Sequence, residues 1–412
     1  MRPIEVSLRL CAVAAVAACA PGRGAARPGS AAPAALALVR HVEHLDSLGR
    51  EPMVVEHPDG TLFVAGYGRA HSTLWKSADH GRSWSRVDVE RGAGGLVGNS
   101  DVDLAVARDG TLYFASMHFD RAAGEGRQIA VGVSRDAGAT WAWTRLSQAR
   151  FDDRPWVKVA PDGTAHVIWN DGSGVSHAVS RDRGATWTRG ERVHPRGGSS
   201  HLAVGPAGEV AVRVTPASAS ANRFDPGVDL VAVSTDAGAT WRTHTAPGNL
   251  VWDTAAFNRW VEPLAWDERG ALYSFWADGR ALWLARSADR GATWTSWPVA
   301  EGRDSAFFPY LAARGAGELA ATWSSGAGAT LQWHLAHLAV RDDGRPPRVV
   351  ESAPYRADTW RIRGGGFTDP PTRDTAGEYL AVAFLRDGTL AVVTPIQAPG
   401  RLGFAWWSFE VR

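Results

Sequence analysis

The chain has 412 residues, with 44 Lys and Arg against 43 Asp and Glu, so its formal net charge is only +1. A content of 45% hydrophobic and 21% charged residues is typical of a globular protein and excludes disorder over most of the chain. The balanced charge provides no basic surface for phosphates, so we expect no nucleic-acid partner. The 2 Cys exclude a disulfide framework and a cysteine-rich zinc cluster.

Residues 1–19 have the pattern of an export signal. A basic start precedes an apolar stretch over residues 10–18, which is too short to span a bilayer in the mature protein. The end of this stretch, Val16-Ala17-Ala18-Cys19, resembles the lipobox of bacterial lipoproteins. That resemblance implies a lipid on Cys19 and an anchor in the cell envelope, while ordinary signal-peptidase cleavage, the alternative, would give a secreted protein. Residues 20–34 are rich in Ala, Pro and Gly and predict a flexible tether.

One octapeptide occurs five times in the body of the chain. It reads S-x-D-x-G-x-[ST]-W, and its copies begin at Ser77, Ser134, Ser180, Ser234 and Ser287. Asp and Gly at this spacing are typical of a tight hairpin turn, in which the carboxylate accepts N–H bonds and Gly adopts a positive φ. The Trp then begins the next strand and packs between neighbouring units. We therefore expect the five Asp side chains to be structural and not catalytic.

A second repeat alternates with the octapeptide. A turn of the Asp-Gly type, followed by an alternating strand, begins at residues 58, 108, 161, 206, 268, 315 and 386. Each unit then holds four strands, which is one blade of a β-propeller. The seven blades are predicted over about 51–90, 100–147, 153–194, 199–246, 260–300, 305–352 and 378–412.

The sequence thus predicts an all-β fold, a seven-bladed propeller of four-stranded blades over residues 35–412. The last unit supplies only three strands, so the strand predicted over 35–45 is expected to complete that blade and to close the ring. A six-bladed ring is the alternative, because the last units are irregular.

The octapeptides resemble the Asp boxes, or BNR repeats, of the sialidase-like β-propeller superfamily, over nearly all of the chain after the tether. In that superfamily the Asp boxes lie at the rim, away from the active face, and true sialidases have six blades. The Phe/Tyr-Arg-Ile-Pro element of sialidases has its nearest counterpart here in Gly49-Arg50-Glu51-Pro52. The exposed loop Gly66-Tyr67-Gly68-Arg69 holds no Asp that could act as the acid.

The expected ligand site is the face at which the innermost strands begin, around a central channel. The resemblance implies three Arg for a substrate carboxylate, a Tyr nucleophile with a Glu, and an Asp acid/base. The catalytic candidates are Tyr310, with Tyr379 as its alternative, Glu262 and Asp153. The substrate-binding candidates are Arg154, Arg259, Arg373, Trp156, Asp278 and Arg280.

The leading functional prediction is an exported propeller that binds glycans or acidic carbohydrate on its channel face. An exo-acting glycoside hydrolase of the exo-α-sialidase type is the alternative, and a protein-assembly scaffold is a third, weaker one. We expect no cofactor and no metal, because the short pairs His41-x-x-His44 and His334-x-x-His337 fall on opposite faces of strands. We also expect a monomer that meets the membrane only through its lipid anchor.

Overall fold

The computed structural model describes residues 35–412, except for 69, 216–226, 249–250, 253–262, 279–280, 302–305, 327, 359, 364–371 and 376–377. The predicted signal, Cys19 and the tether lie outside the described residues. Residues 35–412 form one compact unit.

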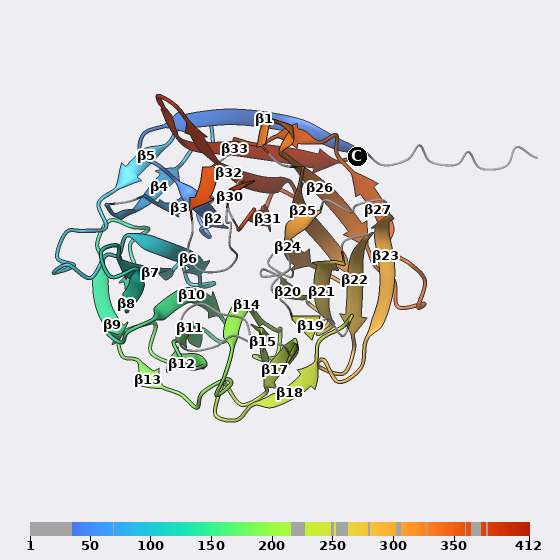
Figure 1. Cartoon of the computed structure of the whole chain (residues 1–412), viewed down its shortest axis with the longest axis horizontal. Coiled ribbons are helices and arrows are strands. Elements are labelled where there is room, and N and C mark those ends of the chain that lie inside the picture. Colours follow the sequence, from blue (N-terminus) through green and yellow to red (C-terminus); the bar gives the residue numbers. More distant parts are fainter. Residues whose placement is uncertain are drawn as a thin grey trace, which may run out of the picture. The chain divides into compact units, whose positions relative to one another are not determined.

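Seven four-stranded antiparallel sheets surround a common axis (Figure 1). Blade 1 contains β2 (Arg50–Glu56), β3 (Leu62–Tyr67), β4 (Ser72–Ser77) and β5 (Ser85–Val87); blade 2 contains β6 (Ser100–Val106), β7 (Leu112–Asp120), β8 (Glu125–Ser134) and β9 (Ala142–Ser147); blade 3 contains β10 (Asp152–Val159), β11 (Ala165–Asp171), β12 (Val175–Ser180) and β13 (Thr188–Arg189). Blade 4 contains β14 (Gly198–Val204), β15 (Val210–Thr215), β17 (Leu230–Ser234) and β18 (Arg242–Thr245); blade 5 contains β20 (Leu264–Trp266), β21 (Leu272–Ala277), β22 (Ala281–Ser287) and β23 (Thr295–Glu301). Blade 6 contains β24 (Phe307–Arg314), β25 (Glu318–Ser325), β26 (Gln332–Ala339) and β27 (Arg348–Glu351), and blade 7 contains β31 (Val382–Phe384), β32 (Leu390–Ala398), β33 (Arg401–Val411) and β1 (Leu36–Leu45). The prediction of seven four-stranded blades is confirmed, and the six-bladed alternative is wrong.

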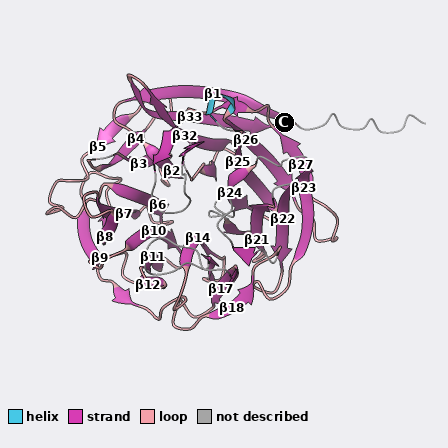
Figure 2. Cartoon of the chain, in the orientation of Figure 1, coloured by secondary structure: helices cyan, strands magenta, loops and turns pink. Residues whose placement is uncertain are grey.

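Short elements lie beside these blades. The strand β28 (Tyr355–Arg356) pairs with β26, β16 (Gly227–Val228) pairs with β19 (Val251–Trp252), and β29 (Trp360–Arg363) pairs with β30 (Thr372–Thr375). Strands dominate the described part of the chain, and its one helical turn is η2 (Gly328–Thr330) (Figure 2).

The hydrophobic core lies between the blades. The second strand of a blade is buried on both faces, as in β3 and β21, because each blade is covered by a neighbour on either side. One apolar cluster joins Phe63 of blade 1 to Phe114 of blade 2, and another joins Phe275 of blade 5 to Trp323 of blade 6. Removal of this apolar surface from water is the main term that holds neighbouring blades together.

The repeated octapeptide forms the turn between the third and fourth strands. In the copy of blade 4, Asp236 accepts hydrogen bonds from the backbone N and the Oγ1 of Thr240 at 2.9 and 2.6 Å. The Ser234 hydroxyl donates to Asp236 and accepts from the backbone N of Gly238, whose φ is 82°. The same bonds occur in the other four copies. The carboxylates are thus used by their own turns, as expected.

The octapeptides also join neighbouring blades. A Cβ at Gly238 would lie 2.1 Å from the Cε1 of His177 in blade 3, and the ring of Trp241 meets the same imidazole edge-on at 5.5 Å. The Trp84 ring contacts Phe404 and Trp406 of blade 7 in the same way. Each turn therefore packs on the blade before it, and this contact requires Gly and Trp at their fixed positions.

The terminal strand β1 is the outer strand of blade 7. It pairs with β33, and the backbone N and O of Ala35 bond the O and N of Arg412. Blade 7 is therefore built from both ends of the described unit, which closes the ring through hydrogen bonds.

Candidate functional site

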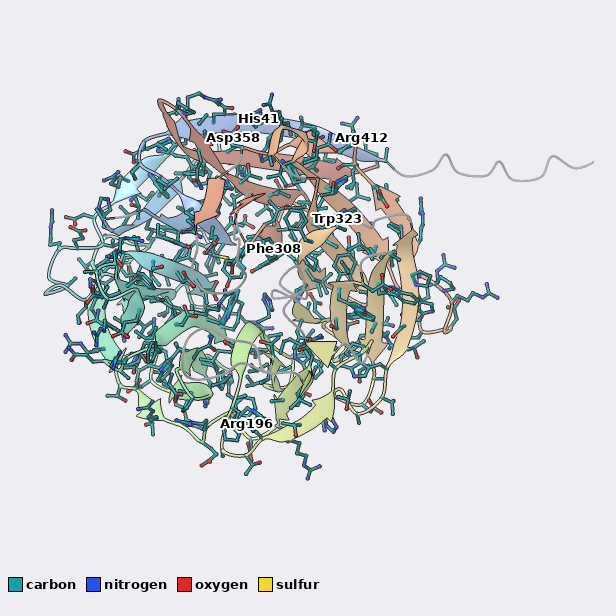
Figure 3. All side chains as sticks on the ribbon, viewed as in Figure 1. His41, Arg196, Phe308, Trp323, Asp358 and Arg412 are labelled. Carbon is teal, nitrogen blue, oxygen red and sulfur yellow. The ribbon has the colours of Figure 1, made fainter. Side chains whose placement is uncertain are left out.

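The innermost strands begin on one face of the ring, opposite to the octapeptide turns, because the strands of each blade alternate in direction. In β2, β10 and β24 a bulge interrupts the pairing with the second strand, at an X-Pro pair. Glu51, Arg154 and Phe308 precede these prolines and have φ values of 47°, 50° and 49°. Figure 3 shows Phe308 near the centre of the ring. A positive φ is costly for a residue other than Gly and clusters at functional sites.

Arg154 reaches across the axis of the ring. It belongs to blade 3, but its Nη2 lies 2.6 Å from the Glu378 carboxylate and its Nη1 lies 2.7 Å from the hydroxyl of Tyr379, both at the start of blade 7. Its Nε lies 3.6 Å from Asp153. Arg154 is only 5% exposed, so the guanidinium holds these groups in a buried, hydrogen-bonded arrangement.

A third carboxylate, that of Glu51, joins this group from blade 1. The Tyr67 hydroxyl donates to Glu51 at 2.6 Å, and the Arg50 Nε lies 3.6 Å from the same carboxylate. The backbone N of Glu378 donates to Glu51 at 3.4 Å. We call Arg50, Glu51, Asp153, Arg154 and Glu378 the axial cluster; it is built from blades 1, 3 and 7.

A layer of aromatic side chains packs against the axial cluster. The Trp156 ring meets Tyr379 at 5.0 Å and His201 at 4.9 Å, and His201 meets Tyr310 at 5.3 Å. The Tyr310 hydroxyl points to the sulfur of Met53 at 3.8 Å. These five residues come from five blades and are buried. At this level, side chains from five blades contact one another around the axis of the ring.

Burial perturbs the acids of the axial cluster. It raises the pKa of Asp153 to about 7, and the nearby Asp101 adds to this effect while Arg154 opposes it. Burial also raises the pKa of Glu51 to about 7, with Arg50 opposing and Glu378 adding to the rise. The Asp153 side chain keeps 27% of its surface exposed, so it remains accessible. Acids that titrate near neutral pH are suited to donating and accepting protons.

A further ion pair lies on the neighbouring strands. Asp103 accepts hydrogen bonds from the Lys158 Nζ at 2.7 Å and from the backbone N of Val157 at 2.9 Å. Burial raises the pKa of Asp103, and the Lys158 charge opposes this rise. Burial lowers the pKa of His201 to about 3, so this imidazole is neutral at physiological pH. Asp103 and Lys158 link β6 to β10 and support the strand that carries Asp153.

The structure brings four of the predicted site residues together, two in the axial cluster and two in the aromatic layer. Asp153 and Arg154 are in the axial cluster, and Trp156 lies in the aromatic layer. Tyr310 lies in the aromatic layer too, whereas its alternative, Tyr379, is the tyrosine that bonds Arg154.

Among the other predicted site residues, Asp278 is the one whose side chain the structure describes. Asp278 follows β21 and accepts hydrogen bonds from the Trp283 Nε1 and the backbone N of Ala281, both at 2.8 Å. Glu262, Arg259, Arg280 and Cys19 lie outside the described residues. The backbone of Arg373 belongs to β30, and its side chain is outside the description.

The sequence contained a signal for Glu51, a member of the axial cluster that was not among the predicted catalytic or substrate-binding residues. Proline follows Glu51, Arg154 and Phe308 at the same point of three innermost strands, and the sequence repeats this pair at Glu262-Pro263. A repeated X-Pro at the start of a strand marks a bulge, and the bulge turns the X side chain toward the axis. Nothing in the sequence indicates that Glu378 pairs with Arg154, which lies 224 residues earlier.

The described part of the chain contains neither a cluster of metal ligands nor a membrane-spanning helix. There, no group of three or more His, Cys, Asp or Glu side chains is arranged to hold a metal ion. Nor do the described residues include a helix long and apolar enough to cross a bilayer.

No protein-family model matches this chain, and no curated protein matches it. Solved structures do match. An ulvan lyase, described as a polysaccharide lyase, is 12% identical over 89% of this chain and 95% of its own, with a TM-score of 0.53. Virginiamycin B lyase from Staphylococcus aureus is 13% identical over 92% of this chain and 100% of its own, with a TM-score of 0.52. A protein of unknown function from Dyadobacter fermentans is 14% identical over 92% and 99%, with a TM-score of 0.50. At these identities the similarity shows the fold alone.

Proposed function

We propose that this chain is a carbohydrate-active β-propeller that cleaves a glycosidic bond at the axial cluster. The observation that carries the proposal is the placement of a half-buried acid, Asp153, and a buried carboxylate, Glu378, on either side of the Arg154 guanidinium, in surroundings that raise the pKa of Asp153. Asp153 is the more exposed of the two acids, so it is the one that a substrate can reach. This arrangement supplies a proton donor and a carboxylate on one face of the ring.

Glycoside hydrolysis requires these two groups. Asp153 gives its proton to the glycosidic oxygen as the bond to the anomeric carbon breaks. The Glu378 carboxylate, held by Arg154 at 2.6 Å, stabilises the positive charge that develops on the sugar ring. Water then adds its oxygen to the anomeric carbon and returns a proton to Asp153. Arg154 positions both carboxyl groups, since it contacts each of them.

The contacts favour this route over the tyrosine route of the exo-α-sialidase alternative. Burial raises the pKa of Tyr310, and Asp103 adds to the rise, so its phenolate is disfavoured. Burial raises the pKa of Tyr379 well above its usual value, although Arg154 opposes this effect. Arg154 is already paired with Glu378, so we propose a glycan whose cleavage does not depend on a carboxylate held by Arg154. The fold adds support by analogy, since a polysaccharide lyase shares it.

Glycan binding without cleavage is the second candidate function. It is favoured by the mutual bonding in the axial cluster, in which Tyr67 bonds Glu51 and Tyr379 bonds Arg154. Groups held in this way position a ligand without requiring a free nucleophile. A docking platform for protein assembly is the weaker third candidate.

Export remains part of the proposed function. We propose that Cys19 is lipidated and that residues 20–34 tether the propeller to the cell envelope; without the lipid the protein would be secreted. Metabolic labelling with a radioactive fatty acid tests this proposal. Label that enters the wild-type chain and is lost in Cys19→Ser supports the anchor, and label in neither chain contradicts it.

Turnover by the full chain tests the proposed hydrolysis. We would incubate it with fluorogenic glycosides, a sialoside among them, and with a glycan array. Asp153→Asn is expected to lower turnover by about 10²–10⁴-fold, which is the usual contribution of a general acid. Asp88→Asn, which changes an exposed Asp, is the matched control and should retain full activity. Array binding without turnover would support the second candidate, and neither binding nor turnover would contradict both.

A further inference from the structure

The outer strand of blade 7 differs from the other outer strands. The strand β1 has 10 residues, whereas the outer strands of the remaining blades have 2 to 7. Among the described strands β1 pairs only with β33, so it presents one edge outward. Figure 3 shows His41 of this strand at the outer rim of the ring. Soluble proteins keep such edges short or interrupt them, because an open edge pairs with other chains.

The edge of β1 is also apolar. The exposed large hydrophobic side chains of the described residues are Leu38, Val39, Leu45 and Leu402, with 44%, 44%, 53% and 46% of their surfaces accessible. Three of them lie on β1. The fourth lies next to its end, because the backbone N of Asp46 bonds the O of Leu402. Exposed apolar side chains gathered on one edge mark an interaction surface.

The usual protection of an edge is weak here. The next longest outer strand, β23, contains Pro298, which cannot donate to an added strand. β1 contains no proline, and its charged residues are Arg40 and Glu43. A bulge between Leu38 and Arg40 interrupts its pairing with β33, but Arg40 to Leu45 continues without a break. This regular stretch is long enough to pair with a strand.

We infer that the occupant of this edge is a second copy of the chain, paired antiparallel along β1 about a two-fold axis at Val42. In this register Arg40 lies opposite His44 of the second copy, while the other pairs are complementary. Glu43 lies opposite His41 of the second copy, and Leu45 lies opposite its Leu38–Val39 bulge. A shift of the axis to Glu43 would place two carboxylates opposite each other, which is destabilising. The two blades then form one sheet of eight strands.

The pairing is expected to be reversible. A standard interface buries about 1,200–2,000 Å² in total, and one edge strand contributes less than that. We therefore expect dissociation constants in the micromolar range, on the order of 10⁻⁶–10⁻⁴ M. The inference differs from the monomer expected from the sequence, and it does not depend on the proposed function.

Sedimentation velocity of the full chain over a range of concentrations tests the inference. The wild-type chain should shift from monomer to dimer as its concentration rises. Leu38→Lys with Leu45→Lys should remain monomeric, because the lysine at position 45 of one copy would face Val39 and the lysine at position 38 of the other, which sets like charges against each other across the two-fold axis. Thr243→Lys is the control, since Thr243 is exposed on β18, the outer strand of blade 4, and it should still dimerise. Circular dichroism would check that all variants are folded.

Cross-linking tests the register. In a Cys11→Ser, Cys19→Ser background, Val42→Cys should oxidise to a covalent dimer, because directly opposite residues of antiparallel strands lie within disulfide range. Glu43→Cys should cross-link more slowly, since His41 is its predicted neighbour. Three results would each overturn the inference. The wild-type chain could be a monomer at every concentration, the variant with both lysines could still dimerise, or the control variant could fail to dimerise. Binding of the Cys19→Ser monomer to phospholipid vesicles through Leu38 and Leu45 would assign the edge to a lipid surface instead.

Discussion

Replacement of Arg154 by Met is the perturbation that tests the axial contacts most severely. The change keeps the volume of the side chain but removes the guanidinium that bonds Glu378 at 2.6 Å and Tyr379 at 2.7 Å. The Glu378 carboxylate is then left without its cation in a buried position. Removing one partner of a buried ion pair usually destabilises a protein by about 3–5 kcal/mol.

This loss can be converted into a melting temperature. At about 2 cal/mol/K per residue, unfolding of residues 35–412 changes the entropy by roughly 0.8 kcal/mol/K. Arg154→Met should therefore lower the Tm by about 4–6 °C. The double variant with Glu378→Gln should recover part of this loss, because no unpaired charge remains. Differential scanning calorimetry of the full chain measures both.

An exposed pair provides the control for Arg154. Arg183 lies 2.6 Å from Asp109, the same distance, but these two side chains are 54% and 44% exposed. Exposed ion pairs contribute about 0–1 kcal/mol, so Arg183→Met should lower the Tm by no more than about 1 °C. Equal shifts for the two variants would refute the argument that Arg154 ties blade 3 to blade 7 through buried contacts.

Three further predictions concern the octapeptide turns and the pH dependence of stability. Gly238→Ala should strongly lower the free energy of unfolding, because its Cβ would lie 2.1 Å from His177 and its φ is 82°. Gly163→Ala should lower it less, because the φ of Gly163 is also positive, at 90°, but the space around it is open. Urea unfolding of the two variants compares these losses. Hydrogen bonds from Thr240 and Ser234 lower the pKa of Asp236 to about 2. The stability that the Asp236 carboxylate contributes is therefore present above pH 4 and is lost as the pH falls toward 2. Urea unfolding at a series of pH values measures this loss. Burial lowers the pKa of His177 to about 3, so as the pH falls the imidazole is protonated in the unfolded chain before it is protonated in the folded one. Stability should therefore begin to fall below about pH 6.5. His177→Phe should reduce the slope of stability against pH in this range.

The repeats made the fold predictable from the sequence. Five octapeptides and seven Asp-Gly-type turns fix the number of blades, because each turn has its own local hydrogen bonds and needs no distant partner. The structural role of Asp236 was predictable for the same reason. The apolar second strands then fit between neighbouring blades on both faces.

The axial cluster was only partly predictable. Asp153, Arg154 and Trp156 were identified because they collect at the start of one innermost strand. Tyr379 was an alternative candidate, but its pairing with Arg154, and that of Glu378, could not be predicted. Both residues lie more than 220 residues from Arg154 and meet it only when the ring closes. The contacts in the aromatic layer were not predicted. The alternation of side chains along a strand indicates which of them point to the axis of the ring, but not how far each one extends.

The pH dependence of glycan turnover tests the central claim, that the axial acids perform the chemistry. The measurement compares kcat/KM of the full chain and of Asp153→Asn from pH 5 to pH 9 on the best glycoside of the panel. We predict a wild-type rate that falls about tenfold per pH unit above a pKa near 7, and a variant that has lost both the rate and this inflection. A variant that keeps the wild-type rate and the same inflection would contradict the account.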